Sequence, residues 1–312
     1  MKGLWIENSA VSYRDDLELE AKNHEVEVEI TLAGVCGTDL ELLRGYYNFV
    51  GVPGHEFVGK VLTPGEWCGK RVVADINFGC GVCEFCSRGI PHHCLARRTL
   101  GINQASGAFA ERITVPTSNL IGIPGSVPDS HAVFAEPLAA AIQITEQLEL
   151  GQCQILLVGA GRLGRMVAWV INKLVPSATL DVMVRNDNRR SQLPDVNLVR
   201  QADLERIYDV AIDCTGNPEG FGAALEALKA QGTLVIKSTY ARELNVDMSR
   251  IVVDEIVIQG SRCGPMDQAV AFLERYPEVF SSTNQRVFAL QDFQQAFELA
   301  GNPSVDKVLI QS

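Results

Sequence analysis

A glycine-rich turn between an apolar strand and a helix is the feature that most constrains the fold of this 312-residue chain. Apolar residues at 154–158 lead into Gly159-Ala-Gly161-Arg-Leu-Gly164, and a helix is expected from Met166 to Leu174. This G-x-G-x-x-G spacing is typical of a dinucleotide site, because its glycines permit a tight turn, a close pyrophosphate and close helix packing. The helix N-terminus adds unpaired N–H groups that attract phosphate. The alternative is a tight turn that binds no ligand.

Strands and helices alternate around this turn, which predicts an α/β fold with a doubly wound parallel sheet over residues 138–264. The other strands expected there are Thr179–Val184, Tyr208–Ile212, Thr233–Ile236 and Glu255–Gln259, with a helix at Phe221–Leu228. Residues 1–137 are rich in glycine, proline and short strand patterns, and they predict a separate β-rich domain. Its expected strands are Val26–Leu32, Val58–Leu62, Arg71–Asp75 and Ala108–Val115, and a helix is expected over His131–Leu148. Residues 265–312 are expected to return to the first domain.

Four of the nine cysteines lie within fifteen residues, at Cys80, Cys83, Cys86 and Cys94. This spacing predicts one tetrahedral zinc ion held by four thiolates, in a lobe at about residues 78–98. A site with four protein ligands has no open position, so we expect it to be structural. A disulfide loop or unpaired thiols are the alternative. The odd number of cysteines and the absence of a signal-peptide pattern favour a reducing, cytoplasmic location.

Composition excludes several classes of function. The net charge of −11 argues against nonspecific nucleic-acid binding, which needs a basic surface. No apolar run approaches the ~18 residues that a membrane-spanning helix needs, so we expect neither nucleic acid nor membrane as a partner. The hydrophobic fraction of 46% is ordinary for a globular protein.

The segment after the second predicted strand of the sheet indicates the form of the dinucleotide. An acid about 20 residues beyond the glycines binds the ribose of NAD, but Arg185 stands at that place. A guanidinium there suits the 2′-phosphate of NADP, and Asn186, Arg189 and Arg190 follow it. The alternative is NAD, with Asp187 as the ribose ligand.

A second group of metal-binding residue types lies outside the cysteine cluster. Cys36 follows a predicted strand, His55 and Glu56 share a glycine-flanked turn, and Glu136 precedes a predicted helix. A cysteine, a histidine and a glutamate with water in the fourth position are what a catalytic zinc ion needs.

These motifs together resemble the zinc-dependent medium-chain dehydrogenases of the alcohol, polyol and sugar group, with the glucose, sorbitol and threonine dehydrogenase types closest in motif. The resemblance covers nearly the whole chain. It is carried by the glycine loop, the cysteine lobe and four further segments, which are Cys36-Gly-Thr38-Asp39, Gly54-His55-Glu56, Ala135-Glu136-Pro137-Leu138 and Asp213-Cys214-Thr215-Gly216. It implies a GroES-like catalytic domain followed by a Rossmann domain.

The resemblance also implies individual roles. Cys36 and His55 are expected to bind the catalytic zinc, with Glu56 or Glu136 as the third ligand and Thr38 passing the substrate proton. Glu41 takes a position where many members have a relay histidine, and it either contacts a polyhydroxylated substrate or is solvated. The residues expected at the cofactor are Gly159, Gly161, Arg162, Leu163, Gly164, Arg185, Asn186, Arg190, Thr215, Ser238, Thr239, Ser261 and Lys307.

The sequence therefore predicts an enzyme with two zinc ions per chain, one catalytic and one structural. It would transfer hydride between NADP, or alternatively NAD, and an alcohol, polyol or sugar hydroxyl or the matching carbonyl. The family implies a homodimer or homotetramer. The alternative is a relative that binds zinc and NADPH without catalysis, as a structural or regulatory module.

Overall fold

The computed structural model describes residues 1–19, 22, 24–185, 190–240, 243–281 and 283–311. The chain divides into two compact units. Unit 1 comprises Met1–Glu136 and Met266–Ser312, and unit 2 comprises Pro137–Pro265. A helix–sheet architecture is present in each, which confirms the predicted α/β class.

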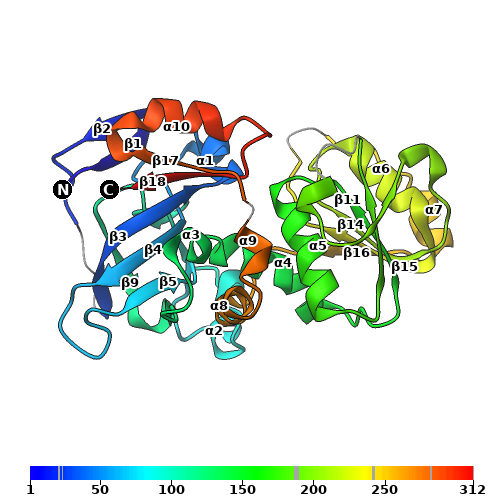
Figure 1. Cartoon of the computed structure of the whole chain (residues 1–312), viewed down its shortest axis with the longest axis horizontal. Coiled ribbons are helices and arrows are strands. Elements are labelled where there is room, and N and C mark those ends of the chain that lie inside the picture. The colour runs from blue at the N-terminus through cyan, green and yellow to red at the C-terminus, as the bar shows by residue number, and fades with distance from the viewer. Residues whose placement is uncertain (20–21, 23, 186–189, 241–242, 282, 312) are drawn as a thin grey trace. The chain divides into compact units, whose positions relative to one another are not determined.

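Unit 2 contains a six-stranded sheet in the order β13-β12-β11-β14-β15-β16, and every neighbouring pair is parallel. The strands are β11 (Gln154–Val158), β12 (Thr179–Met183), β13 (Asn197–Val199), β14 (Tyr208–Asp213), β15 (Leu228–Ile236) and β16 (Val257–Gly260). Helices α5 (Arg162–Leu174) and α6 (Pro218–Ala227) lie on opposite faces of the sheet (Figure 1). Because the strand order reverses between β11 and β14, the crevice for a ligand opens at the carboxyl ends of these two strands.

The central strand shows why this sheet forms. Ile155 to Val158 are fully buried, as expected for a strand that helices cover on both faces. Leu156 and Val158 pack with Phe221 and Leu225 of α6. Gly159 follows at φ 98°, in the left-handed region that favours glycine, and turns the chain into α5.

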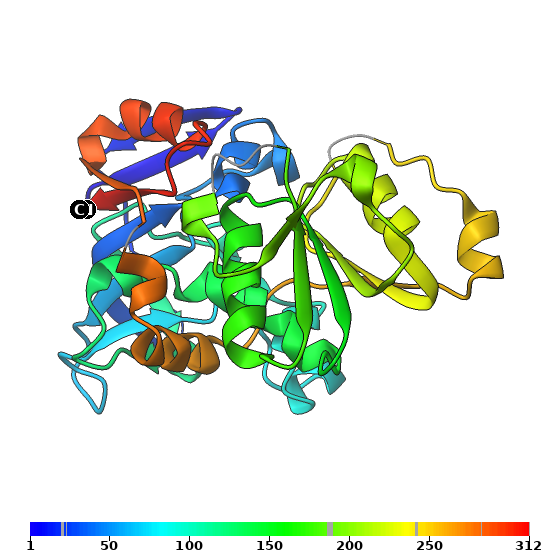
Figure 2. The same ribbon diagram turned by 45° about the vertical axis from the view of Figure 1, so that its right-hand side comes forward.

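Unit 1 is built on a seven-stranded sheet in the order β10-β5-β4-β3-β18-β17, with β9 also paired to β3. The strands are β3 (Glu25–Val35), β4 (Glu56–Val61), β5 (Arg71–Ala74), β9 (Arg112–Pro116), β10 (Leu120–Gly122), β17 (Gln285–Ala289) and β18 (Lys307–Gln311). β18 comes from the C-terminal end of the chain and pairs antiparallel with β3. The red C-terminal strand accordingly lies among the blue N-terminal strands in Figures 1 and 2.

Smaller elements complete the two units. In unit 1 these are β1 (Gly3–Glu7), β2 (Ala10–Arg14), β6 (Asn77–Phe78), β7 (Arg98–Leu100), β8 (Gln104–Ala105), α1 (Gly37–Leu42), α2 (Glu84–Ser87), α3 (Asp129–Ala132), α8 (Met266–Arg275), α9 (Glu278–Ser281) and α10 (Phe293–Ala300). Helix α4 (Ala135–Gln147) begins at the end of unit 1, and α7 (Met248–Val253) belongs to unit 2. Within the part of the chain that the structure describes, no helix combines the length and the apolar character that crossing a membrane requires.

Several predicted elements differ from the structure in their bounds, and two of these differences concern unit 1 and the start of α4. The single helix expected over His131–Leu148 is divided into α3 and α4 at residues 133–134. The strand expected at Ala108–Val115 begins only at Arg112, because the backbone of Gly107, Ala108 and Phe109 instead bonds to residues 52–54.

Candidate active site

Unit 1 brings together three of the predicted zinc ligands. Cys36 follows β3 and is the N-cap of α1, while His55 directly precedes β4 and Glu56 is the first residue of that strand. The antiparallel register of β3 and β4 places Gly34 opposite Glu56, so both strands deliver their ligands at one edge. One ligand atom from each of Cys36, His55 and Glu56 lies within 4.8 Å of the other two.

Asp39 supports this group and was not assigned a role from the sequence. Its side chain is fully buried, its Oδ2 accepts a hydrogen bond from the Cys36 N–H at 2.8 Å, and its Oδ1 lies 3.4 Å from His55 Nδ1. Burial opposes a charge on His55, but the nearby Asp39 and Cys36 outweigh it and raise the pKa of His55 well above its ordinary value. A carboxylate beside the second ring nitrogen is the usual support for a metal-binding histidine. Its position three residues after Cys36, at a helix start, is the sequence signal that identifies it.

Glu56 has a buried partner from the far end of the chain. The pairing of β18 with β3 places Lys307 near the end of β3, and Lys307 Nζ forms an ion pair with Glu56 Oε2 of the next strand, β4. Lys307 is 3% exposed and Glu56 is 1% exposed. The Lys307 ammonium also lies 5.3 Å from the ring centroid of Phe134. The Lys307 ammonium is thus enclosed in unit 1 and bound to Glu56, and its expected contact with the pyrophosphate stays a prediction.

Glu136 and Thr38 lie near the same group. Glu136, at the start of α4, is not among the three residues whose ligand atoms meet. Burial raises the pKa of its carboxyl to about 7, with His55 opposing and Glu56 reinforcing the shift. Thr38 Oγ1 lies 3.8 Å from Cys36 Sγ. Glu41, whose role the sequence left open, forms a largely exposed ion pair with Arg44 at 2.5 Å.

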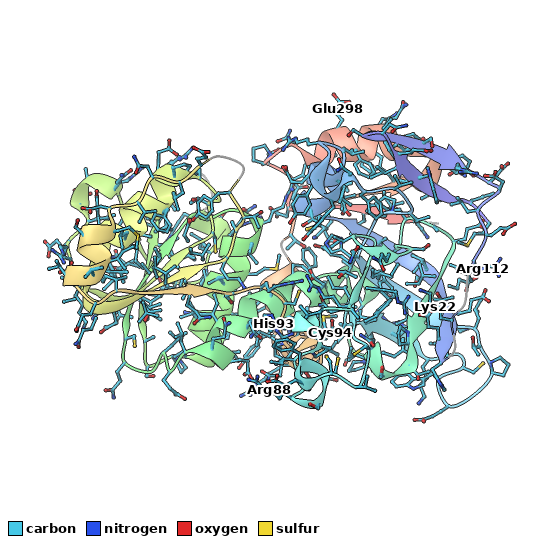
Figure 3. All side chains as sticks on the ribbon, turned by 180° about the vertical axis from the view of Figure 1, so that it is seen from behind. Lys22, Arg88, His93, Cys94, Arg112 and Glu298 are labelled. Carbon is cyan, nitrogen blue, oxygen red and sulfur yellow. The ribbon has the colours of Figure 1, made fainter. Side chains whose placement is uncertain are left out.

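The four-cysteine lobe forms a second compact group of possible ligands. The sulfurs of Cys80, Cys83, Cys86 and Cys94 all lie within 4.8 Å of one another. Figure 3 shows Cys94 beside His93 and Arg88 in this lobe. The N–H groups of Val82 and Cys83 lower the pKa of the Cys80 thiol to about 6, which favours the thiolate that binds metal. Desolvation raises the pKa of the Cys86 thiol to about 11.

Both groups fit zinc in their donor chemistry. Ligand atoms about 2.0–2.3 Å from a tetrahedral zinc ion are roughly 3.3–3.8 Å apart, and the atoms of each group are close enough to converge on one ion. Four thiolates complete a closed structural site, whereas a cysteine, a histidine and a carboxylate leave a fourth position open.

The glycine turn of unit 2 fits a dinucleotide. A Cβ added to Gly164 would meet the Gly159 carbonyl oxygen at 1.9 Å, and one added to Gly159 would meet Thr215 Cγ2 at 2.8 Å. A Cβ added to Gly161 would meet nothing within 4 Å, which leaves the space that a phosphate needs. Gly161 is the N-cap of the thirteen-residue helix α5, so the first turn of that helix, including Arg162 and Leu163, faces this space with its N–H groups.

The other predicted cofactor residues of unit 2 follow its parallel strands and share the carboxyl edge of the sheet. Thr215 follows β14, and its hydroxyl donates to Asp213 Oδ1 at 2.6 Å. Ser238 and Thr239 follow β15 and lie against Gly216. Ser261 follows β16, is 7% exposed, and its Oγ accepts a hydrogen bond from Lys237 Nζ at 3.1 Å.

The basic segment after β12 is described only in part. Arg185 is exposed, and Asn186, Asp187 and Arg189 lie outside the described residues. Arg190 Nη1 donates to the Val196 carbonyl oxygen. Arg200, which follows β13 and was not predicted from the sequence, donates from Nη1 to the Arg185 carbonyl oxygen at 2.8 Å. Two arginines thus lie together at the carboxyl ends of β12 and β13.

Comparison with known proteins supports this description. Residues 22–125 match the alcohol dehydrogenase GroES-like domain, and residues 194–279 match the zinc-binding dehydrogenase domain. The chain is 27% identical over 341 residues to an L-threonine 3-dehydrogenase from Marinomonas sp. (strain MWYL1), covering 99% of this chain and 96% of the relative.

Solved structures agree with the two family matches. A short chain alcohol dehydrogenase from E. coli CFT073, complexed with the cofactor NADH, is 26% identical with a TM-score of 0.88, and the match covers 100% of this chain and 99% of that one. L-idonate 5-dehydrogenase from Escherichia coli is 23% identical with a TM-score of 0.87, and the match covers 100% and 98%; it shows the fold. The two family matches together span more than half of the chain, in the order of units 1 and 2. This chain therefore belongs to the zinc-dependent medium-chain dehydrogenases/reductases and is a zinc-dependent oxidoreductase with a GroES-like and a Rossmann domain.

Proposed function

We propose that this enzyme transfers hydride between NADP and an alcohol, polyol or sugar hydroxyl, or the matching carbonyl in reverse. The observation that carries the proposal is the convergence of Cys36, His55 and Glu56 in unit 1. Its three ligand types leave one position for a substrate oxygen. The substrate named for the relative from Marinomonas, threonine, carries a secondary hydroxyl.

The residues of the unit 1 metal centre would each have a separate role at the reacting hydroxyl. Bound zinc supplies a Lewis acid for the substrate oxygen, and the nicotinamide supplies the hydride acceptor. Cys36 and His55 hold the metal, and Asp39 fixes the histidine ring through its Nδ1 edge. Thr38 Oγ1, 3.8 Å from Cys36 Sγ, would accept the hydroxyl proton and relay a proton to solvent. Glu56 is the third ligand that the geometry favours, since Glu136 lies outside the group of converging atoms.

We further infer two zinc ions per chain and a preference for NADP. Four converging sulfurs in the lobe support the second, structural ion. Arg185 and Arg200, joined at the carboxyl ends of neighbouring strands, support a 2′-phosphate site, since two guanidinium groups can share one dianion. Zinc-binding thiolates remain reduced in the cytoplasm, where we place the enzyme.

We propose a homo-oligomer, and the edge of the unit 2 sheet supports it. β16 is the edge strand of that sheet, and Val257 and Ile258 on it are 52% and 42% exposed. An edge strand with exposed apolar side chains is suited to pairing with a second chain. Light scattering of the native protein and of Ile258→Glu tests this, because the charge should dissociate an assembly formed at β16.

A spectrophotometric screen at 340 nm tests the activity. Polyols, sugars, simple alcohols and threonine are offered with NADP and NAD in parallel, and metal content is measured by mass spectrometry. We expect turnover with at least one hydroxyl substrate, two zinc ions per chain and a higher kcat/KM with NADP. Cys36→Ala and His55→Ala should lose one zinc ion and all turnover while still binding cofactor. Full activity in either variant would exclude the proposed metal centre.

A further inference from the structure

One buried arginine in unit 2 connects the two segments that the dinucleotide would contact. Arg165 lies on α5, four residues after Gly161, and is 7% exposed. Its Nε donates to the Gly161 carbonyl oxygen at 3.3 Å, and its Nη1 donates to Gln192 Oε1 at 2.6 Å. A single guanidinium therefore joins the pyrophosphate turn to the segment that follows β12.

Gln192 is held by a second side chain of the same helix. Trp169, one turn after Arg165, donates from Nε1 to the Gln192 carbonyl oxygen at 3.1 Å. Both the side chain and the backbone of Gln192 are thus fixed on α5. The start of the same segment is fixed from β13, where Arg200 binds the Arg185 carbonyl oxygen at 2.8 Å.

The geometry suits arginine. The planar guanidinium presents donors in fixed directions, so its Nε and Nη1 reach two acceptors that belong to different segments. A lysine ammonium donates from a single atom and lacks this fixed spacing between donors. Arg165 also adds a full positive charge one turn from the N-terminus of α5, where a phosphate would bind.

We propose that Arg165 is a positioning residue that couples the pyrophosphate turn to the adenosine-ribose segment of the cofactor site. Through Gly161 it holds the turn, and through Gln192 it holds residues Arg190–Gln192, so these two described parts are preorganised before the dinucleotide binds. This inference rests on the proposed function, because it assumes that unit 2 binds a nicotinamide dinucleotide.

Calorimetric titration tests the coupling without relying on turnover. NADP, NAD, 2′,5′-ADP and 5′-AMP are titrated into the zinc-loaded native protein and into Arg165→Met, Arg165→Lys and Gln192→Ala. Loss of one charge-assisted hydrogen bond corresponds to roughly a tenfold change or more, so Arg165→Met and Gln192→Ala should each weaken NADP about tenfold or more. Arg165→Lys should recover only part of that loss. The ligand 2′,5′-ADP, which reaches both segments, should lose more affinity than 5′-AMP.

Two further comparisons separate positioning from general stability. Arg165→Met/Gln192→Ala should bind NADP about as weakly as Arg165→Met alone, because both changes remove the same contact. KM for the cofactor should rise while kcat at saturating cofactor stays within about twofold. Arg250→Met is the matched control, because Arg250 is another partly buried arginine of unit 2. Its Nη2 donates to the carbonyl oxygens of Glu226 and Leu228. This substitution should leave the affinity for the cofactor unaltered.

The outcomes distinguish this inference from the proposed function. Unchanged NADP affinity in Gln192→Ala, or in a folded Arg165→Met, would overturn the coupling even if the native enzyme uses NADP. The coupling would also be overturned if the double variant lost NADP affinity by the full product of the losses in the two single variants. Tighter binding of NAD than of NADP by the native protein would overturn only the cofactor preference, and weakened NAD binding in Arg165→Met would still support the coupling.

Discussion

The buried ion pair between Lys307 and Glu56 predicts that Lys307→Met destabilises the metal-free centre more than the zinc-loaded one. Both side chains are almost completely inaccessible to solvent, at 3% and 1% exposure. Removing one partner of such a pair leaves a buried charge and typically costs about 3–5 kcal/mol. Without metal, the remaining Glu56 carboxylate would lie near Glu136 and Cys36, which are themselves acidic groups.

Zinc changes the size of this effect, because a dication compensates the carboxylate that has lost its lysine. If the variant costs about 4 kcal/mol without zinc and about 2 kcal/mol with it, the thermodynamic cycle requires zinc to bind about 2 kcal/mol more tightly. That difference corresponds to roughly a 30-fold lower Kd. Lys307 would then weaken metal binding while stabilising the protein that has not yet acquired its metal.

Urea unfolding and zinc competition titrations measure the two sides of this cycle independently. The protein is prepared with zinc only in the four-cysteine lobe, and then with both ions, as verified by metal analysis. Lys60→Met, a change at an exposed lysine of β4, serves as the matched control and should change stability by no more than about 0.5 kcal/mol. Glu56→Gln/Lys307→Met should recover part of the loss, since it removes the unpaired charge. Equal losses with and without zinc, or an unchanged zinc Kd, would refute the reasoning.

Three other predictions follow from the two units. Cys83→Ala should reduce the zinc content from two ions to one and lower the unfolding midpoint, and turnover should fall only as a consequence. Metal analysis and thermal scans measure whether zinc and stability are lost before turnover. A stable, fully assembled but inactive variant would mean that the structural and catalytic metals are assigned the wrong way round. Gly161→Ala should keep the fold and lose dinucleotide affinity, because its Cβ occupies the open space where a phosphate would bind. Gly164→Ala should instead lower stability by about 1–3 kcal/mol, because its Cβ meets the Gly159 carbonyl oxygen. Equal behaviour of the two variants in calorimetry and thermal scans would contradict these separate roles of the two glycines. Arg185→Ala should lower kcat/KM for NADP about tenfold or more and leave kcat/KM for NAD nearly unchanged. An equal loss for both cofactors would show that Arg185 does not bind the 2′-phosphate.

The fold class could be predicted from the sequence because its signals are local. An apolar strand, a glycine turn and a helix lie next to one another in the chain, and their order predicts a parallel sheet without knowledge of distant contacts. The boundaries of helices and strands were harder to predict from the sequence. The division of the predicted helix at residues 133–134 follows from tertiary packing around Phe134, which contacts Phe280 from the C-terminal segment.

The candidate site was predictable where its residues carry recognisable chemistry. Cys36, His55 and Glu56 come together as a set, and their types alone indicate a metal. The partner of Glu56 could not be found in the same way, because Lys307 is 251 positions away and depends on the pairing of β18 with β3. Arg165 was missed for a different reason: it lies within an otherwise apolar helix face, and only the fold of the segment after β12 brings Gln192 to it.

The position of β18 has a consequence for how the protein is made. Unit 1 uses the two ends of the chain, and unit 2 is inserted between them. During synthesis, unit 2 is complete about forty residues before the last strand of unit 1 emerges. Glu56 therefore has no partner ammonium until Lys307 has been synthesised, 251 positions later. The order of synthesis thus makes the dinucleotide unit an early folding module and the finished metal centre a late event.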